Sequence, residues 1–200
     1  MKKMIYLGVV LALTAFASNG LAQQDTTASG GTMKSDDKMM MSGKKNADSK
    51  FMMMAATSDM NEIGLSNVAL QKSQNEEVKK MAQMIIDDHT RASEELKSLA
   101  MSKSVMLPAE MDAKHKAMMD KMSSMSGADF DKMYIKAMVK DHEKAVKLFQ
   151  KESTSGKDAD AKAFAAKILP VLQSHLTMAQ SMMNGMMNGG SMSSGKMSGM

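Results

Sequence analysis

The chain has 200 residues, a formal net charge of +4, no cysteine and 29 methionines. Without cysteine it can form no disulfide, no thiolate metal site and no cysteine nucleophile. Aromatic residues make up only 4% of the chain, and no basic stripe is interleaved with them, so we expect no nucleic-acid partner.

The first 22 residues are typical of a secretory signal peptide. Lys2 and Lys3 form a charged start, residues 6–17 are mostly apolar, and Gly20-Leu21-Ala22 supplies the small residues that a signal peptidase reads. The apolar stretch is short for a permanent anchor, so we predict cleavage after Ala22 and no transmembrane anchor afterwards. The expected product is periplasmic or secreted, and association with the outer membrane stays open.

Polar, low-complexity segments flank the rest of the chain. Residues 23–49 and 184–200 are rich in Ser, Gly, Lys and Met, and both are predicted to be disordered. Residues 50–183 remain between them, which is the size of one domain.

The middle of the chain carries the signals of five helices. Asn75 can cap the second helix, with Glu76 and Glu77 in its first turn, where they suit the helix dipole. Pro108 is expected to start the short third helix, because proline is tolerated in a first turn. Pro170 falls inside the last helix, where it predicts a kink. The predicted helices cover residues 50–72, 76–101, 109–123, 128–151 and 158–183, with turns at 126–127 and 153–156.

This pattern predicts an all-α fold. Strand signals are missing, since β-branched residues are few and no alternating runs occur. Four long helices and one short one are typical of a four-helix bundle with a short extra crossover helix. The short turns within the first and last pairs of long helices predict two antiparallel hairpins.

Each long helix places one ionisable residue on its apolar face, at spacings of three or four residues from its apolar neighbours. These residues are Glu62, His89, His142 and His175, and Asp88 and Asp141 stand beside two of the histidines. One interpretation is a core site for a divalent metal ion, built from carboxylate and imidazole ligands. The other is a structural polar layer that fixes the register of the helices.

Distances along the helices test this grouping in part. Glu62 and His89 lie 13 and 14 residues from Asn75, so at 1.5 Å per residue both sit about 20 Å from that turn. His142 and His175 lie 13 and 20 residues from Ser155, an offset of about 10 Å. Glu62 with His89 is therefore the better supported pair. His115, on the short helix, is expected to be exposed.

The methionines form clusters near the chain ends. Thioether sulfur is a soft ligand that suits Cu(I), so these clusters are candidate sites for copper or silver. Sacrificial oxidation and compositional drift are the alternatives. The candidate clusters are Met39, Met40, Met41, Met182, Met183, Met186 and Met187.

Several motifs, in their order and spacing, resemble one known family over about residues 49–180. The motifs are Asp87-Asp88-His89, Leu107-Pro108, Asp141-His142-Glu143-Lys144 and Ala163-Phe164-Ala165-Ala166-Lys167 with His175. The chain is similar there to the domain of unknown function 4142 family, which is described as ferritin-like, exported and in part assigned to the outer membrane. The resemblance implies a ferritin-like bundle and export, and it implies no activity.

Three functions remain open at this point. The first is a non-catalytic exported protein that binds metal, copper included, or serves in envelope stress. The second is an enzyme, a di-metal oxidase or peroxide-consuming protein, although the Glu-x-x-His motif of di-iron bundles is missing from the sequence. A purely structural or interaction role in the envelope is a third reading.

Overall fold

The computed structural model describes residues 47–189, which are helices and their connections, with no strand among them. The predicted all-α fold is therefore confirmed. The predicted signal peptide, most of the predicted linker with Met39, Met40 and Met41, and residues 190–200 lie outside the described residues. The five helices are α2 (Ala47–Lys72), α3 (Glu76–Ser102), α4 (Ala113–Ser123), α5 (Gly127–Ser155) and α6 (Ala159–Gly189).

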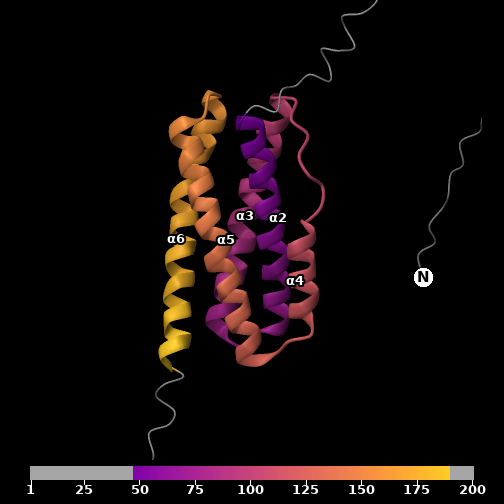
Figure 1. Ribbon diagram of the computed structural model, residues 1–200, viewed down its shortest axis with the longest axis vertical. Coiled ribbons are helices and arrows are strands. Elements are labelled where there is room, and N and C mark those ends of the chain that lie inside the picture. The colour runs from indigo at the N-terminus through magenta and orange to yellow at the C-terminus, as the bar shows by residue number, and fades with distance from the viewer. Residues whose placement is uncertain (1–46, 190–200) are drawn as a thin grey trace, which may run out of the picture. The chain divides into compact units, whose positions relative to one another are not determined.

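The four long helices form a bundle of two hairpins (Figure 1). Residues 73–75 join α2 to α3, and residues 156–158 join α5 to α6. In the bundle α2 packs against both α3 and α5, and α6 packs against both α5 and α3. The long connection from α3 to α5 contains α4, which lies against the outside of α2. No helix within residues 47–189 has an apolar stretch long enough to cross a membrane.

Helix α3 begins where the capping signal at Asn75 predicts. The side chain of Asn75 accepts a hydrogen bond of 2.9 Å from the backbone N–H of Glu77, so one free donor of the first turn is satisfied. Glu76 and Glu77 occupy that turn, where their charge favours the positive end of the helix dipole. Local capping chemistry thus sets the length of the first hairpin.

Three predicted helix ends are displaced. Pro108 does not start the short helix, because Asp112 caps it instead and accepts the backbone N–H of His115 at 3.0 Å. The turn predicted at 153–156 is helical up to Ser155, and Gly156 follows the last helical residue. The last helix continues to Gly189, six residues past its predicted end at Met183.

Gly156 is required by close packing at the end of α5. A Cβ atom there would lie 2.6 Å from the Oε1 atom and 2.7 Å from the carbonyl oxygen of Glu152. No larger residue fits this turn without moving backbone.

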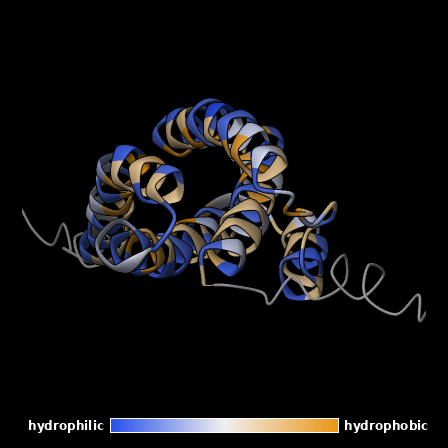
Figure 2. Ribbon diagram, turned by 90° about the horizontal axis from the view of Figure 1, so that it is seen from above, coloured by the Kyte–Doolittle hydropathy of each residue, from blue (hydrophilic) through white to orange (hydrophobic). Residues whose placement is uncertain are grey.

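The apolar core is divided into two clusters along the bundle. In the view from above, each helix carries both hydrophobic and hydrophilic residues (Figure 2). The buried apolar residues form two groups, one toward each end of the bundle. One cluster includes Phe51, Leu96 and Phe149, and the other includes Leu65 and Tyr134. On every long helix, the residues between these clusters include a buried polar side chain. The polar layer therefore lies at mid-height of the bundle.

Glu152 is a buried carboxyl group at the end of α5. Its side chain is buried near Asp48, and its Oε1 atom has no hydrogen-bond partner within the described residues. Burial, followed by the neighbouring carboxyl group of Asp48, raises the pKa of Glu152 from 4.5 to about 7. The folded protein therefore binds a proton here between these two pH values, where the unfolded chain has released it.

Replacing Glu152 by Gln should alter the pH dependence of stability. Because the folded-state pKa is raised, the stabilisation is fully present below pH 4.5 and is lost as the pH rises through 7. The native protein should lose about 2–3 kcal/mol more than Glu152→Gln between pH 4.5 and 8. Urea unfolding across this range measures the difference, with Glu143→Gln, at an exposed site on α5, as the control. Parallel profiles for native protein and Glu152→Gln would contradict the assignment.

Candidate metal centre

Four buried side chains, one from each long helix, meet between the two apolar clusters. Glu62 comes from α2, His89 from α3, His142 from α5 and His175 from α6, and none is more than 3% exposed. One nitrogen of each histidine lies within 4.8 Å of a nitrogen of both others. The ring centroids lie 5.3–5.6 Å apart. The four residues that the sequence selected on the helix faces therefore share one small volume.

The Oε2 atom of Glu62 faces the histidine nitrogens. It lies 3.0 Å from Nε2 of His89 and 3.6 Å from Nε2 of His142. The same Nε2 atom of His142 lies 3.3 Å from Nδ1 of His175. Ligands about 2.0–2.1 Å from one tetrahedral ion stand about 3.3 Å from each other, so these separations suit a single ion.

The second nitrogen of each imidazole is held by an acceptor. Nδ1 of His89 contacts Asp59 at 2.8 Å, Nδ1 of His142 contacts the carbonyl oxygen of Met138 at 3.0 Å, and Nε2 of His175 contacts Asp88 at 3.0 Å. A carbonyl or carboxylate oxygen only accepts, so the N–H group of each ring lies on this outer side. The inner nitrogens, Nε2 of His89, Nε2 of His142 and Nδ1 of His175, are then the atoms that could bind a metal ion.

The contact between His142 and His175 needs a positive charge to be favourable. Burial lowers the pKa of both rings to about 4, so both are neutral at pH 7. With their N–H groups directed outward, Nε2 of His142 and Nδ1 of His175 present lone pairs to each other across 3.3 Å. A cation bound between them removes this repulsion.

Glu62 and His89 form the charged half of the cluster. Burial raises the pKa of Glu62. Burial alone would lower the pKa of His89, but the carboxyl groups of Glu62 and Asp59 outweigh it and raise the value to about 9. The inner atoms of the pair, Oε2 and Nε2, are close but lack hydrogen-bond geometry, and neither has another partner within the described residues. The two atoms thus form a buried ion pair of 3.0 Å that lacks a hydrogen bond.

The predicted offset between His142 and His175 is wrong. Because α5 runs to Ser155 and α6 begins only at Ala159, His142 lies 13 residues from its end of the hairpin and His175 lies 16. The difference of three residues is about 5 Å, half of the predicted offset. The shift in helix ends therefore removes about half of the predicted offset.

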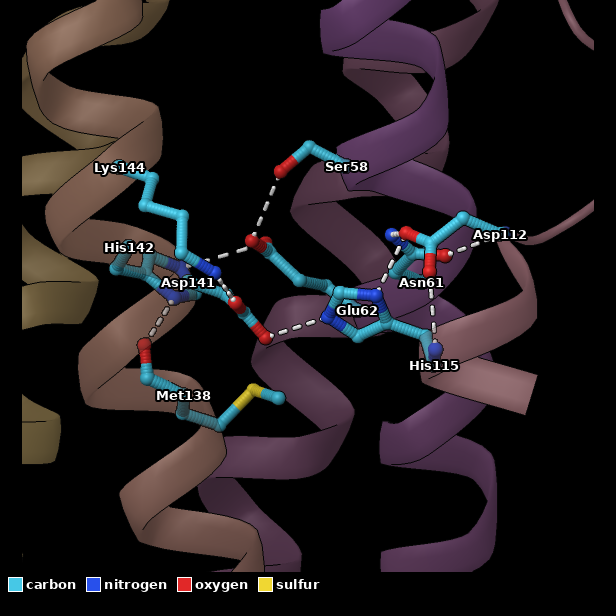
Figure 3. A network of polar contacts seen from close by, with 9 residues as sticks. All are labelled: Ser58, Asn61, Glu62, Asp112, His115, Met138, Asp141, His142 and Lys144. Carbon is cyan, nitrogen blue, oxygen red and sulfur yellow. Dashed lines mark hydrogen bonds and ion pairs between the residues drawn. The ribbon is translucent and has the colours of Figure 1, made fainter. Parts of the chain in front are cut away.

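Asp88 and Asp141 occupy different places from those expected of ligands. Asp88 contacts His175 on its outer side and also pairs with Arg91. Asp141 binds His115 and Lys144 (Figure 3). Neither carboxylate contributes an atom to the centre of the histidine cluster.

His115 is buried, contrary to the prediction that it is exposed. It is 7% exposed, and its ring lies between Asp112 at 2.7 Å and Asp141 at 2.9 Å. Asn61 donates a hydrogen bond to Asp112. Figure 3 shows how this network joins α4 to α2 and α5. The network around His115 thus fastens α4 to the bundle, and both ring nitrogens of His115 have carboxylate partners.

Asp59 is the site residue that the sequence reasoning missed. It is 4% exposed and accepts hydrogen bonds from His89 and from the hydroxyl of Ser93, 2.9 Å away. Burial raises the pKa of Asp59, against the lowering effect of His89. The available signal was its place three residues before Glu62, on the same side of α2.

For a metal ion held by the three histidines, Asp59→Asn should weaken binding without removing a ligand. Loss of the carboxylate behind His89 makes the ring a poorer ligand, and the change typically costs about 10–100-fold in affinity. Competition titration with a chromophoric chelator measures the effect. The matched control is Asp112→Asn, which alters a carboxylate–histidine pair outside the cluster. Equal affinities for Asp59→Asn and the native protein would contradict this role.

A small cavity leads to the cluster from the side of α3 and α6. It has a volume of about 170 Å³, and its lining includes Asp88, His89 and Glu95. Lys167 and Arg91 also line it, and Lys167 forms an ion pair with Glu95 at 2.7 Å. His89 is the cluster residue that lines this cavity.

The methionine cluster on α6 is helical, and most of it is packed. Met182, Met183 and Met186 are partly buried against the apolar cluster that contains Leu65, whereas Met187 is 65% exposed. Three of these four candidate soft ligands therefore have a core to fill, which the sequence-based argument did not anticipate.

Solved structures with similar folds are distant in sequence. A DUF305 fragment from Deinococcus radiodurans has a TM-score of 0.63 at 12% identity, over 70% of this chain and 96% of that one. CopM in its Cu(II)-bound form has a TM-score of 0.60 at 23% identity, over 69% and 96%. A DUF305 protein from Streptomyces coelicolor has a TM-score of 0.61 at 14% identity, over 70% and 92%. At these identities the likeness supports the helical fold alone.

The sequence matches a family profile, although no curated protein matches the chain. The family profile described as domain of unknown function DUF4142 matches residues 33–182, three quarters of the sequence, and includes all four side chains of the buried cluster. The chain therefore belongs to the DUF4142 family, as its motifs predicted.

Proposed function

We propose that the protein is an exported, non-catalytic metal-binding bundle that holds one divalent transition-metal ion between Glu62, His89, His142 and His175. The observation that carries the proposal is the outward anchoring of all three imidazoles, which turns the inner nitrogen of each ring and one carboxylate oxygen toward each other. Such outer partners are the usual support of a metal-ligating histidine.

The charges around the cluster favour a dication. Glu62 lies inside the cluster, and Asp59 and Asp88 lie directly behind two of the rings. A bound ion would displace the proton of His89, and with all three rings then neutral these carboxylates balance the charge of a divalent ion and leave little net charge buried. The same arrangement explains how a bundle core can tolerate so many polar groups.

Copper(II) is the ion that we expect to bind most tightly. Three imidazoles and one carboxylate oxygen suit Cu(II) and Zn(II), and the Irving–Williams order places Cu(II) above the other divalent ions of the first transition row. The fold is also that of CopM, whose structures are described in Cu(II)-bound and Cu(I)-bound forms. A DUF305 neighbour from Streptomyces coelicolor is described as a secreted protein, which agrees with the export predicted from the first 22 residues.

The alternative of a di-metal enzyme has less support. A pair of metal ions is normally held by several bridging and terminal carboxylates. Here Glu62 is the carboxylate that faces the histidines, while Asp141 is engaged with His115 and Lys144. A purely structural layer has less support too, because it leaves the lone pairs of His142 and His175 opposed.

Metal titration of the purified protein tests the proposal. With competing chelators present, we expect one tightly bound Cu(II) or Zn(II) per chain, with Cu(II) bound more tightly. In His142→Ala/His175→Ala this site should be lost. The proposal is wrong if the native protein binds neither ion more tightly than the double variant does.

A further inference from the structure

A second cavity lies between α3 and α6, and it is lined with methionine. It has a volume of about 850 Å³, and its side chains include Met81 and Met84 from α3 and Met178 and Met182 from α6. We call this cavity the methionine groove. The remaining lining is mostly polar, apart from Pro170. The groove exists because α3 and α6 contact each other much less extensively than α5 and α6 do.

The spacing of these methionines directs them to one place. Met81 and Met84 are three residues apart on α3, and Met178 and Met182 are four residues apart on α6, so each pair lies on one helix face. Both faces line the same groove. Two pairs of thioether side chains, one from each helix, therefore line the same groove.

Packing does not explain all four residues. Met81 is 1% exposed and belongs to the core, but Met178 is 38% exposed at the side of the groove. A side chain that stays partly exposed gains little free energy from burial. Leucine also fills a helical core with better defined rotamers than methionine does. Methionine differs from leucine in its polarisable sulfur atom, which here lies in a partly open space.

The charged groups at the groove cancel each other. Lys80 and Glu77 are its charged lining residues, and they form an ion pair with each other at 3.1 Å. No His or Asp side chain lines the groove. Its ligand chemistry is therefore that of neutral thioethers, which prefer soft monovalent ions to hard or borderline divalent ones.

We propose that the methionine groove binds a soft monovalent metal ion of the Cu(I) class through the sulfur atoms of Met84, Met178 and Met182, with Met81 as the inner wall. This site is separate from the histidine cluster and does not depend on it. Met178 is three residues from His175 and Met84 is five residues from His89, so the two sites lie about one to two helical turns apart. The chain thus offers nitrogen and oxygen ligands to divalent transition-metal ions and sulfur ligands to soft monovalent ions.

A silver titration, with Ag(I) as the redox-inert probe of this class, tests the groove. The background is His142→Ala/His175→Ala, so that the histidine cluster does not contribute. Met84→Leu/Met178→Leu is expected to lower the Ag(I) affinity at least about tenfold, since two sulfur ligands are lost while volume is nearly conserved. The matched control is Met186→Leu/Met187→Leu, which removes two methionines of α6 that do not line the groove.

Methionine-methyl NMR gives a second readout on the native chain. The proposal predicts that the methyl signals of Met84, Met178 and Met182 shift first with Ag(I), and that the control variant binds like its parent. The groove assignment is overturned if Met186→Leu/Met187→Leu loses affinity while Met84→Leu/Met178→Leu does not, or if neither change has an effect. Binding of Zn(II) at the histidine cluster of the native chain is measured separately, so failure of one site leaves the other result intact.

Discussion

His142→Ala is expected to weaken the binding of Cu(II) and Zn(II) at least about 1000-fold. This loss exceeds the roughly 10–100-fold that typically follows when a residue hydrogen-bonded to a metal-binding histidine is removed. His142 is fully buried, and its Nε2 atom lies 3.6 Å from Glu62 and 3.3 Å from His175, so it contacts both neighbours in the cluster. A methyl group at this position supplies no ligand and leaves space for water. Competition titrations of the native and variant proteins measure the loss.

The matched control is His115→Ala. His115 is also a buried histidine held by carboxylates, and it lies outside the cluster, between Asp112 and Asp141. Its removal should loosen α4 and lower the stability of the fold, with little effect on metal affinity. If His142→Ala and His115→Ala weakened binding equally, the loss would reflect general damage to the bundle, and the assignment of His142 as a ligand would fail.

Metal should also stabilise the fold strongly. An ion that binds only the folded state, at a free concentration 1000 times its Kd, adds about 4 kcal/mol to the free energy of unfolding. For a domain of this size that corresponds to a rise in Tm of about 10–15 °C. The relief of the lone-pair contact between His142 and His175 belongs to this gain. Scanning calorimetry with and without Zn(II) measures the shift.

The double variant His142→Ala/His175→Ala gives the comparison for this prediction. Its Tm should not respond to Zn(II) at the same concentration, because Glu62 and His89 alone do not make a tight site. A native Tm that does not move with saturating metal, or an equal rise in the double variant, would show that the stabilisation does not come from the cluster.

The periodic pattern of apolar residues was enough to predict the bundle. Glu62, His89, His142 and His175 could be selected because each interrupts an apolar helix face, and the capping signal at Asn75 places the first hairpin correctly. Family membership was also visible in the motifs around His89 and His142. These features depend on local spacing, which the sequence displays directly.

The other features depend on contacts between distant segments. Asp141 stands beside His142 in the sequence, but the helix turns it toward His115. His115 is buried only because α4 packs across α2, and Asp59 matters only because α3 brings His89 next to it. The end of α5 depends on Gly156 and Glu152 in their packed positions. Such pairings become predictable only when the arrangement of the helices is known.

X-ray absorption spectroscopy of protein loaded with one equivalent of Zn(II) tests the metal centre most directly. We expect scattering from three imidazole rings and one further oxygen ligand, at about 2.0–2.2 Å from the ion. The same spectrum for His142→Ala/His175→Ala should lack this imidazole signature. A native spectrum with one imidazole or none, or one dominated by sulfur ligands, would contradict a metal centre at Glu62, His89, His142 and His175.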